Sequence, residues 1–295
     1  MKSRLLVLLG AVLLSTGGLG IKFCSFGAWQ VAASRSLFSV VALLLLFPAA
    51  RRAWSTKVML VGVAFLVTNV FFVLATKLTT AANAIFLEYS APLWVLVLSP
   101  FILGEKVRRR DVLSLLVTAA GLVLFFVVPE RATALSPGIV KGNWLALGAG
   151  VGYAFIFMGL RSLRGGNGES AIVVGNTFTV LVCLGPLLSG TAGTPDGFMV
   201  GRPVDWAVVA AIGIFSLGLG YTCCARGMRG VPAAQGALIS LIEPVLNPFW
   251  VWLVFRSERP GPWALIGGAL ILASVAYQSF SAPSREGRSR RGSRT

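Results

Sequence analysis

The sequence predicts an all-α integral membrane protein, with ten transmembrane helices arranged as two inverted five-helix repeats and both termini in the cytoplasm. Its composition, the placement of its basic residues and an internal repeat all indicate this fold class. Of 295 residues, 56% are hydrophobic and only 12% are charged, whereas a soluble domain carries about 25% charged residues. Such a chain has too little polar surface to dissolve in water.

Ten apolar stretches follow one another along the chain, each close to the roughly 20 residues that a helix needs to cross a bilayer. The first, with its basic start, also resembles a cleavable signal peptide, but we interpret it as a retained span because its counterpart later in the chain is a span. The connections are short, so no soluble catalytic or nucleotide-binding domain is expected between spans. The predicted spans are Leu5–Ile21, Val31–Phe47, Val58–Leu74, Ala81–Leu103, Val112–Val128, Trp144–Leu160, Ala171–Leu188, Trp206–Cys224, Ala233–Phe255 and Trp263–Phe280.

The net charge of +16 would suggest a nucleic-acid partner in a soluble protein. In this chain the positions of the basic residues instead indicate how the protein is oriented in the membrane. With the N-terminus inside, the inside segments hold 18 of the 26 lysines and arginines, and the outside segments hold seven. This bias predicts that both termini are cytoplasmic, with no nucleic acid involved. The basic tail, residues 282–295, is expected to be disordered; it either orients and solubilises the protein or touches anionic lipid headgroups.

Two stretches that begin 152 residues apart resemble each other: AANAIFLEYSAPLW from residue 81 and AAQGALISLIEPVLN from residue 233. At this offset Pro92 corresponds to Pro244, and one inserted residue later Glu105 corresponds to Glu258. The chain therefore divides into a first five-span repeat, residues 1–138, a second, residues 139–281, and the tail. Because five is odd, the second repeat enters the membrane from the opposite side, as in many secondary transporters.

Three stretches stand out in the doubled five-span unit: APLWVLVLSPFILGEKV in span four, EPVLNPFWVWLVFRSERP in span nine and GNWLALGAGVGYAFIFMGLR at the start of the second half. With these stretches, the chain resembles the drug/metabolite transporter superfamily. The likeness is to its EamA-like ten-span branch, and it covers nearly the whole chain. It implies secondary transport of amino acids, other metabolites or drugs across a bacterial inner membrane, often outward, through a central cavity lined by both halves. The second copy departs from the family pattern, with Ser257–Glu258 in place of glycine–glutamate.

Two glutamates are the main candidates for the transport site. A carboxylate at the bilayer centre costs about 2.5–3.5 kcal/mol on the insertion scale, so such residues are functional candidates by default. In span nine, Gly236, Ser240, Glu243 and Asn247 share one helical stripe, and at the repeat offset Glu88 takes the place of Ser240. Apolar surroundings favour the protonated form of a carboxylate, so both glutamates could exchange protons at physiological pH.

For Glu243 a structural interpretation stays open beside the functional one. Pro244 frees a backbone carbonyl one turn earlier, and a protonated Glu243 could satisfy that group and brace the kink. Arg35, slightly more than one turn into span two, is a counter-ion for Glu88 or a clamp for an anionic solute group. Alternatively, Arg35 extends to the outer headgroups.

Further polar residues are expected either to line the cavity or to form hydrogen bonds between helices, which contribute about 0.6 kcal/mol each. These are Asn83, Thr68, Asn69, Tyr153, Ser216 and Tyr221. Glycine sets such as Gly148, Gly150 and Gly152 favour close helix approach, which could also permit sliding between helices.

Sequence motifs that the chain lacks exclude several classes of function. The chain has no histidine and no paired cysteine spacing, so no metal, cofactor or serine–histidine–acid triad is expected. No G-x-x-x-x-G-K-[ST] loop is present, so ATP is not the energy source. We therefore predict a proton-coupled secondary exporter of small solutes that works by alternating access, and not an enzyme. A passive channel or facilitator is the alternative, and an intramembrane lipid-modifying enzyme is disfavoured.

Overall fold

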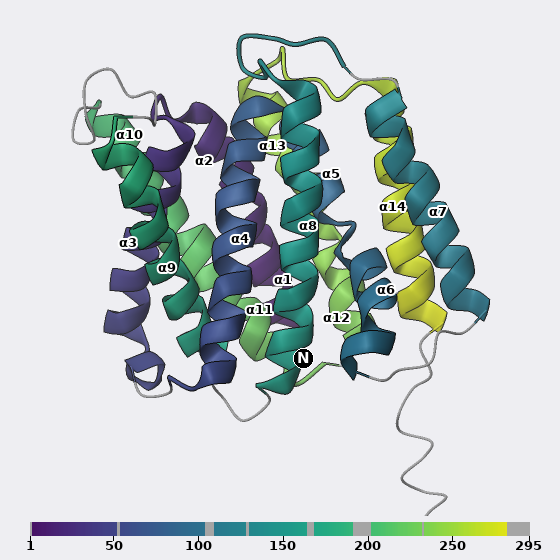
Figure 1. Ribbon diagram of the computed structural model, residues 1–295, viewed down its shortest axis with the longest axis horizontal. Coiled ribbons are helices and arrows are strands. Elements are labelled where there is room, and N and C mark those ends of the chain that lie inside the picture. Colours follow the sequence, from purple (N-terminus) through teal and green to yellow (C-terminus); the bar gives the residue numbers. More distant parts are fainter. Residues whose placement is uncertain are drawn as a thin grey trace, which may run out of the picture.

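The structure, a computed structural model, describes residues 2–51, 54–103, 109–127, 130–163, 168–190, 202–231 and 233–281. These residues form a bundle of helices that run along a common axis (Figure 1). Within these ranges, one isolated bridge between Thr133 and Ser136 is the only β-structure. The glycine–glutamate loop expected at residues 104–105 and the basic tail, residues 282–295, lie outside the described residues.

The helices follow the order of the predicted spans. In the first part of the chain they are α1 (Lys2–Ser15), α2 (Gly17–Phe23), α3 (Ala28–Leu46), the 3-10 turn η1 (Pro48–Arg51), α4 (Thr56–Leu78), α5 (Ala81–Glu88), α6 (Ala91–Leu103) and α7 (Arg109–Val127). In the second part they are α8 (Ile139–Ser162), α9 (Gly168–Leu188), α10 (Pro203–Ala211), the π-helix η2 (Ile212–Gly220), α11 (Tyr221–Met228), α12 (Ala233–Ser240), α13 (Ile242–Val254) and α14 (Pro262–Ser281).

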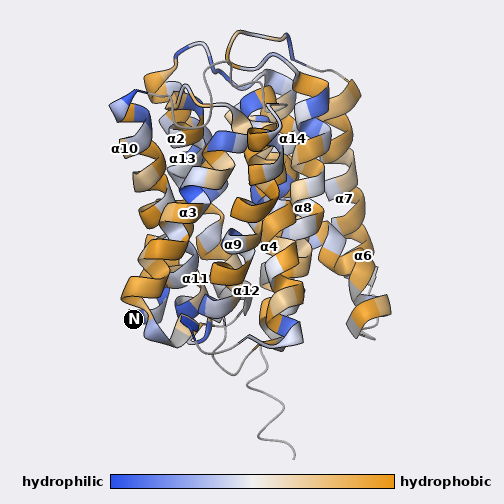
Figure 2. Cartoon of the chain, turned by 60° about the vertical axis from the view of Figure 1, so that its left-hand side comes forward, coloured by the Kyte–Doolittle hydropathy of each residue, from blue (hydrophilic) through white to orange (hydrophobic). Residues whose placement is uncertain are grey.

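The surface of the bundle is that of a membrane protein. Eight helical segments among the described residues are long and apolar enough to cross a bilayer, and two shorter apolar helices, Val112–Val127 and Pro262–Gln278, lie where spans five and ten were expected. Apolar residues cover the outer faces of the long helices, and hydrophilic residues gather at the two ends (Figure 2). Phe101 and Leu188 are 85% and 82% exposed. Large exposed apolar surfaces are rare in water-soluble proteins, whereas lipid accommodates them.

Three of the ten predicted spans are interrupted, and the sequence led us to expect a kink only in span nine, at Pro244. Span one breaks at Thr16 between α1 and α2, span four at Tyr89–Ser90 between α5 and α6, and span nine at Leu241 between α12 and α13. Span eight is continuous but contains the nine-residue π-helix η2. Hydropathy does not detect such breaks, because it is averaged over a window in which apolar residues outnumber the polar ones at the break.

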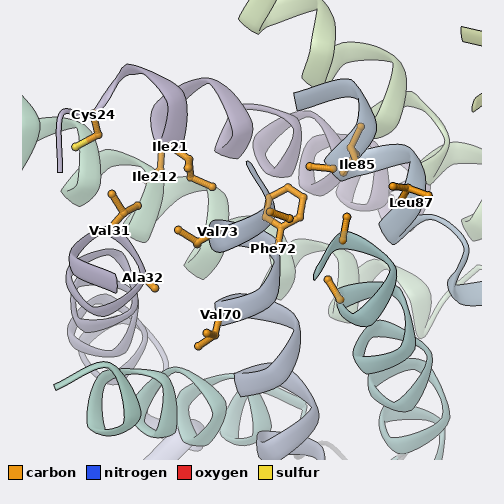
Figure 3. Close-up of a cluster of buried hydrophobic side chains, with 14 of the residues drawn as sticks. Ile21, Cys24, Val31, Ala32, Val70, Phe72, Val73, Ile85, Leu87 and Ile212 are labelled. Atoms are coloured by element: carbon orange, nitrogen blue, oxygen red, sulfur yellow. The ribbon is translucent and has the colours of Figure 1, made fainter. Parts of the chain in front are cut away.

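The two parts of the chain are interleaved. In contacts between them, α4 packs against α8 and α9, α3 against α9 and η2, and α7 against α14. The main core cluster likewise combines Ile21 of α2, Val31 of α3, Val73 of α4 and Ile85 of α5 with Ile212 of η2 (Figure 3). Neither part therefore has a core of its own, and the interior of the bundle belongs to both.

Both ends of the described chain lie at the same end of the bundle, where α1 begins and α14 finishes (Figure 1). We call this the proximal end. At the opposite, distal end lie α2, the start of α5 and the segment that follows α13 (Figure 1). The breaks in spans four and nine lie between the two ends.

The glycines of α8 let this helix approach the break in span four. A Cβ atom on Gly150 would lie 2.6 Å from Ser90 Oγ, 2.9 Å from the carbonyl oxygen of Leu87 and 3.0 Å from that of Glu88. Backbone atoms cannot move aside as a flexible side chain can, so only glycine fits at residue 150. Gly148 and Gly152 similarly face side chains of α4.

We expect Gly150→Ala to lower the free energy of unfolding by about 1–3 kcal/mol, as overpacking of a tight interior does. Thermal unfolding of the purified protein in detergent measures this. Gly185→Ala is the matched control, because no atom lies within 4 Å of a Cβ at this position in α9, and replacing a helical glycine there should be neutral or slightly stabilising. Equal behaviour of the two variants would contradict the prediction.

Candidate functional site

The breaks in spans four and nine occur at equivalent positions and have the same local cause. α5 ends at Glu88 and α12 ends at Ser240, at the repeat offset of 152 residues. Pro92 and Pro244 each follow four residues later, and a proline has no N–H to donate to the carbonyl of the preceding turn. Two backbone carbonyls thereby lose their usual donors inside the bundle. The broken spans also meet, because α5 packs against α13.

Both predicted glutamates lie at these breaks. Glu88 is the last residue of α5 and is 5% exposed, and Glu243 is the second residue of α13 and is 8% exposed. They are close enough to interact electrostatically. One carboxyl group thus comes from each half of the chain, and the two face a common interior.

Tyr89 connects the two breaks, and the sequence analysis missed it. Its hydroxyl lies 2.9 Å from the backbone oxygen of Ser240, the carbonyl that Pro244 deprives of its donor, and 2.9 Å from Glu243 Oε2. In a continuous helix Tyr89 would point about 100° away from Glu88, so it was not placed on the candidate face. Its position between Glu88 and Pro92 was the signal that could have identified it.

Arg35 provides a buried positive charge beside these carboxyls. It is 5% exposed, in the second turn of α3, so its side chain turns into the bundle and does not extend to the headgroups. Its Nη2 donates to the backbone oxygen of Asn69 at 3.3 Å, and its Nε has no hydrogen-bond partner in the described part of the chain. Arg35 interacts electrostatically with Glu88, but no ion pair joins the two.

The π-helix η2 helps to place Arg35. A Cβ on Gly213 would collide with the carbonyl oxygen of Arg35, so this glycine lets η2 lie directly against α3. π-helical segments inside α-helices are frequent at functional sites. Here the segment ends at Gly220, immediately before Tyr221.

Two further predicted residues, Tyr153 and Tyr221, lie beside Tyr89 and the two glutamates. The ring of Tyr153 packs edge-on against that of Tyr89, with centroids 6.4 Å apart, and Tyr153 interacts electrostatically with both glutamates. Tyr221 interacts electrostatically with both glutamates and with Arg35. We call this set of six residues the central cluster: Arg35, Glu88, Tyr89, Tyr153, Tyr221 and Glu243.

The remaining residues of the span-nine stripe lie near the cluster but make local contacts. Ser240 Oγ donates to the Gly236 oxygen of its own helix at 3.0 Å. Asn247 is buried against Gly18 of α2, and its Oδ1 has no hydrogen-bond partner within the described ranges.

Three other predicted residues take part in contacts between or within helices. Asn69 Nδ2 donates to Asn176 Oδ1 at 3.2 Å, and Ser216 Oγ donates to the Leu14 oxygen at 3.3 Å. Thr68 donates to the Ala64 oxygen in its own helix at 2.9 Å.

Asn83 lies elsewhere, toward the distal end. Its Nδ2 donates to Thr79 Oγ1 at 3.3 Å and to Asn143 Oδ1 at 3.2 Å. Asn143 in turn donates to the Phe125 oxygen at 2.9 Å. The structure therefore separates Asn83 from the central cluster.

The distal end is closed by a second polar group centred on Lys22. The Lys22 ammonium donates to the Thr79 oxygen at 2.9 Å, the Leu135 oxygen at 2.5 Å, Ser136 Oγ at 2.8 Å and Glu258 Oε1 at 3.2 Å. The side chains of Lys22 and Glu258 are 1% and 2% exposed. We call these five residues the distal network; it joins α2, the end of α4, the connection between the two halves and the loop after α13.

Two further contacts extend the distal network. The other carboxylate oxygen of Glu258 accepts from the Ala81 amide at 3.3 Å, at the first residue of α5. In the same region Glu130 accepts from the Gly261 amide at 2.5 Å. Burial raises the pKa of the Glu130 carboxyl above its ordinary value. Both contacts tie a loop of one half to a helix or loop of the other.

Nothing in the described residues gathers three histidine, cysteine, aspartate or glutamate side chains as a metal site would require. The four cysteines are free thiols. The chemistry available at the central cluster is therefore ion pairing, hydrogen bonding, proton exchange and aromatic packing.

A bundle of apolar helices with titratable side chains buried at paired helix breaks defines an integral membrane protein with a polar interior. The model of the EamA-like transporter family matches residues 1–127 and 140–280, and the chain belongs to this family. The resemblance seen in the sequence is thereby confirmed, as is the prediction that the protein is a transporter of small solutes and not an enzyme.

Characterised and uncharacterised relatives agree with this assignment. An uncharacterised transporter of Archaeoglobus fulgidus is 28% identical over 204 residues, 69% of either chain. The pseudopaline exporter of Pseudomonas aeruginosa is 28% identical over 193 residues, 65% of this chain and 64% of its own length. The aromatic amino acid exporter of Ancylobacter novellus is 25% identical over 212 residues, 72% of this chain and 71% of its own. One solved crystal structure shares the fold, with a TM-score of 0.62 over 94% of this chain and 96% of that one, at 22% identity.

Proposed function

We propose that the protein is a proton-coupled secondary transporter that exports small solutes across a bacterial inner membrane by alternating access. The observation that carries the proposal is the meeting of two broken spans, one from each half, with a buried carboxyl group at each break. Discontinuous helices that meet near the bilayer midplane are typical of substrate and ion sites in secondary transporters.

We further propose that all ten helical segments span the membrane, as two inverted repeats with both termini in the cytoplasm. The breaks at Glu88 and Ser240 support the repeat, since they fall at its offset. The shared proximal end of the two chain ends supports an even number of spans (Figure 1). The excess of basic residues on that side supports a cytoplasmic proximal end.

In this proposal the structure represents a conformation closed toward the outside. The distal network ties the outer ends of the two halves together through Lys22 and Glu258. In this conformation solute would enter from the cytoplasm at the proximal side, and opening of the distal network would release it outside.

The central cluster suits a solute that has both a carboxylate and an amine. Arg35 offers an unpaired N–H for the carboxylate, the two glutamates can accept from an ammonium group, and three tyrosine rings surround them. A guanidinium binds a carboxylate with two parallel hydrogen bonds. Because one relative is named an aromatic amino acid exporter, L-phenylalanine is the first probe to test.

The test uses purified protein in vesicles with labelled L-phenylalanine and an imposed pH difference. We expect accumulation against the solute gradient in the wild type, and none in the Glu88→Gln, Glu243→Gln double variant. Downhill flux without accumulation would show a passive facilitator. If L-phenylalanine does not move at all, untargeted mass spectrometry of medium from overproducing cells, compared with the double variant and an empty vector, identifies the solute or refutes export.

A further inference from the structure

We propose that Tyr89 is the positioning residue through which the proton on Glu243 controls the contact between the two broken spans. This inference rests on the proposed proton coupling and adds to it a specific hydrogen-bond switch. It starts from a count of hydrogens. A phenol has one hydrogen to donate, yet the Tyr89 hydroxyl lies 2.9 Å from two acceptors, the Ser240 oxygen and Glu243 Oε2.

When Glu243 is protonated, every group in this set is satisfied. The carboxylic O–H of Glu243 donates to the Tyr89 oxygen, and Tyr89 in turn donates to the Ser240 carbonyl. That carbonyl needs such a donor because Pro244 cannot supply the usual one. The end of α5 is then fastened to the end of α12 across the interface of the two halves.

When Glu243 releases its proton to water, the same atoms cannot all be satisfied. The Tyr89 hydrogen turns to the carboxylate, since a hydrogen bond to a charged acceptor is roughly twice as strong as a neutral one. The Ser240 carbonyl is left without a donor, at a depth where no lipid can replace it. Deprotonation therefore moves the Tyr89 hydrogen bond from the end of α12 to Glu243 of α13 and frees the end of α12, a rearrangement of the kind that a change of access requires.

The surroundings of Glu243 are consistent with its being the group that switches. The groups that interact with it electrostatically are Glu88 of α5, Tyr89, Tyr153 of α8, and Tyr221 and Cys224 of α11. None of them carries a positive charge that would hold Glu243 permanently ionised.

The other helices that pack against α13 add no charge at this point. α12 has no titratable residue among its positions, α1 has only Lys2 and Arg4 at its proximal start, and Lys22 of α2 is engaged in the distal network. The titration of Glu243 thus depends on its burial, on its hydrogen bond with Tyr89 and on Glu88, Tyr153, Tyr221 and Cys224.

The test compares Tyr89→Phe with the wild type in the vesicle assay. A pH difference of one unit is equivalent to about a tenfold solute gradient for one proton per solute. We expect the wild type to approach such an accumulation. Tyr89→Phe should fall to a ratio of about one while it still exchanges labelled for unlabelled L-phenylalanine, and the pH dependence of that exchange should flatten. Tyr277→Phe, a half-exposed tyrosine of α14 far from the cluster in sequence, is the matched control and should behave as wild type.

An infrared measurement makes the test independent of transport. A protonated carboxyl band that disappears in Glu243→Gln belongs to Glu243, and in Tyr89→Phe it should shift to higher frequency because its O–H loses an acceptor. Unchanged accumulation and an unshifted band in Tyr89→Phe would overturn the inference, even with the proposed function intact. Failure of the wild type to accumulate solute would instead refute proton coupling, whatever Tyr89→Phe does.

Discussion

Replacing Lys22 by methionine is expected to lower the free energy of unfolding by about 3–5 kcal/mol, as breaking a buried ion pair does. The variant leaves the Glu258 carboxylate buried, with its side chain 2% exposed and its partner cation removed. It also removes the donor for the carbonyl oxygens of Thr79 and Leu135. Thermal unfolding in detergent, with the yield of monodisperse protein, measures the effect.

A double-mutant cycle separates the contribution of the ion pair to the free energy of unfolding from that of packing. Lys22→Met with Glu258→Gln removes both charges and should recover much of the stability that the single variant loses, because an uncompensated buried charge is the main cost. Lys141→Met, which removes an exposed lysine of α8, is the control and should change little. Additive losses in the double variant would show that the two residues act independently. Under the proposed mechanism, the double variant should also spend more time open toward the outside.

Replacing Arg35 by glutamine is expected to weaken the binding of L-phenylalanine by about 10- to 100-fold, as the loss of a charged hydrogen bond of about 1.5–3 kcal/mol predicts. The guanidinium is fixed by the Asn69 oxygen and keeps its Nε unpaired inside the bundle. A binding role predicts a higher KM with little change in kcat, measured as the initial rate of transport in vesicles.

Two further variants distinguish binding from folding. Arg35→Lys keeps the charge but cannot form the two parallel hydrogen bonds of a guanidinium, so its KM should lie between those of wild type and Arg35→Gln. Arg131→Gln, which changes an exposed arginine of the loop before α8, should leave KM unchanged. If Arg35→Gln instead unfolds at lower temperature with an unaltered KM, the role of Arg35 is structural.

Much of the fold could be predicted from the sequence because the bilayer imposes its rules on each segment separately. A stretch such as residues 58–74 must be helical and about 20 residues long wherever it packs, since lipid offers its backbone no hydrogen bonds. The same rule explains why all ten predicted stretches correspond to helices, and why the boundaries differ by only a few residues. The family resemblance followed from residues that are contiguous in the chain and needed no tertiary information.

The candidate site was only partly predictable. Glu88, Glu243 and Arg35 could be found one by one, since a charge in an apolar stretch is conspicuous wherever it lies. Their convergence with Tyr153 and Tyr221 depends on which helix faces overlap, and helical periodicity within one span carries no such information. Tyr89 was missed because its orientation depends on a break that the sequence analysis treated as continuous helix.

The sequence by itself determined the class of protein, the helical segments and the charged residues that must have a purpose in a membrane, because composition and hydropathy act locally. Only the tertiary structure decided that Pro92 and Pro244 produce paired breaks that meet, that Tyr89 bridges them to Glu243, and that Lys22 and Glu258, 236 residues apart, close the distal end. These are contacts between distant segments, and their energies depend on packing geometry that no single stretch of sequence contains.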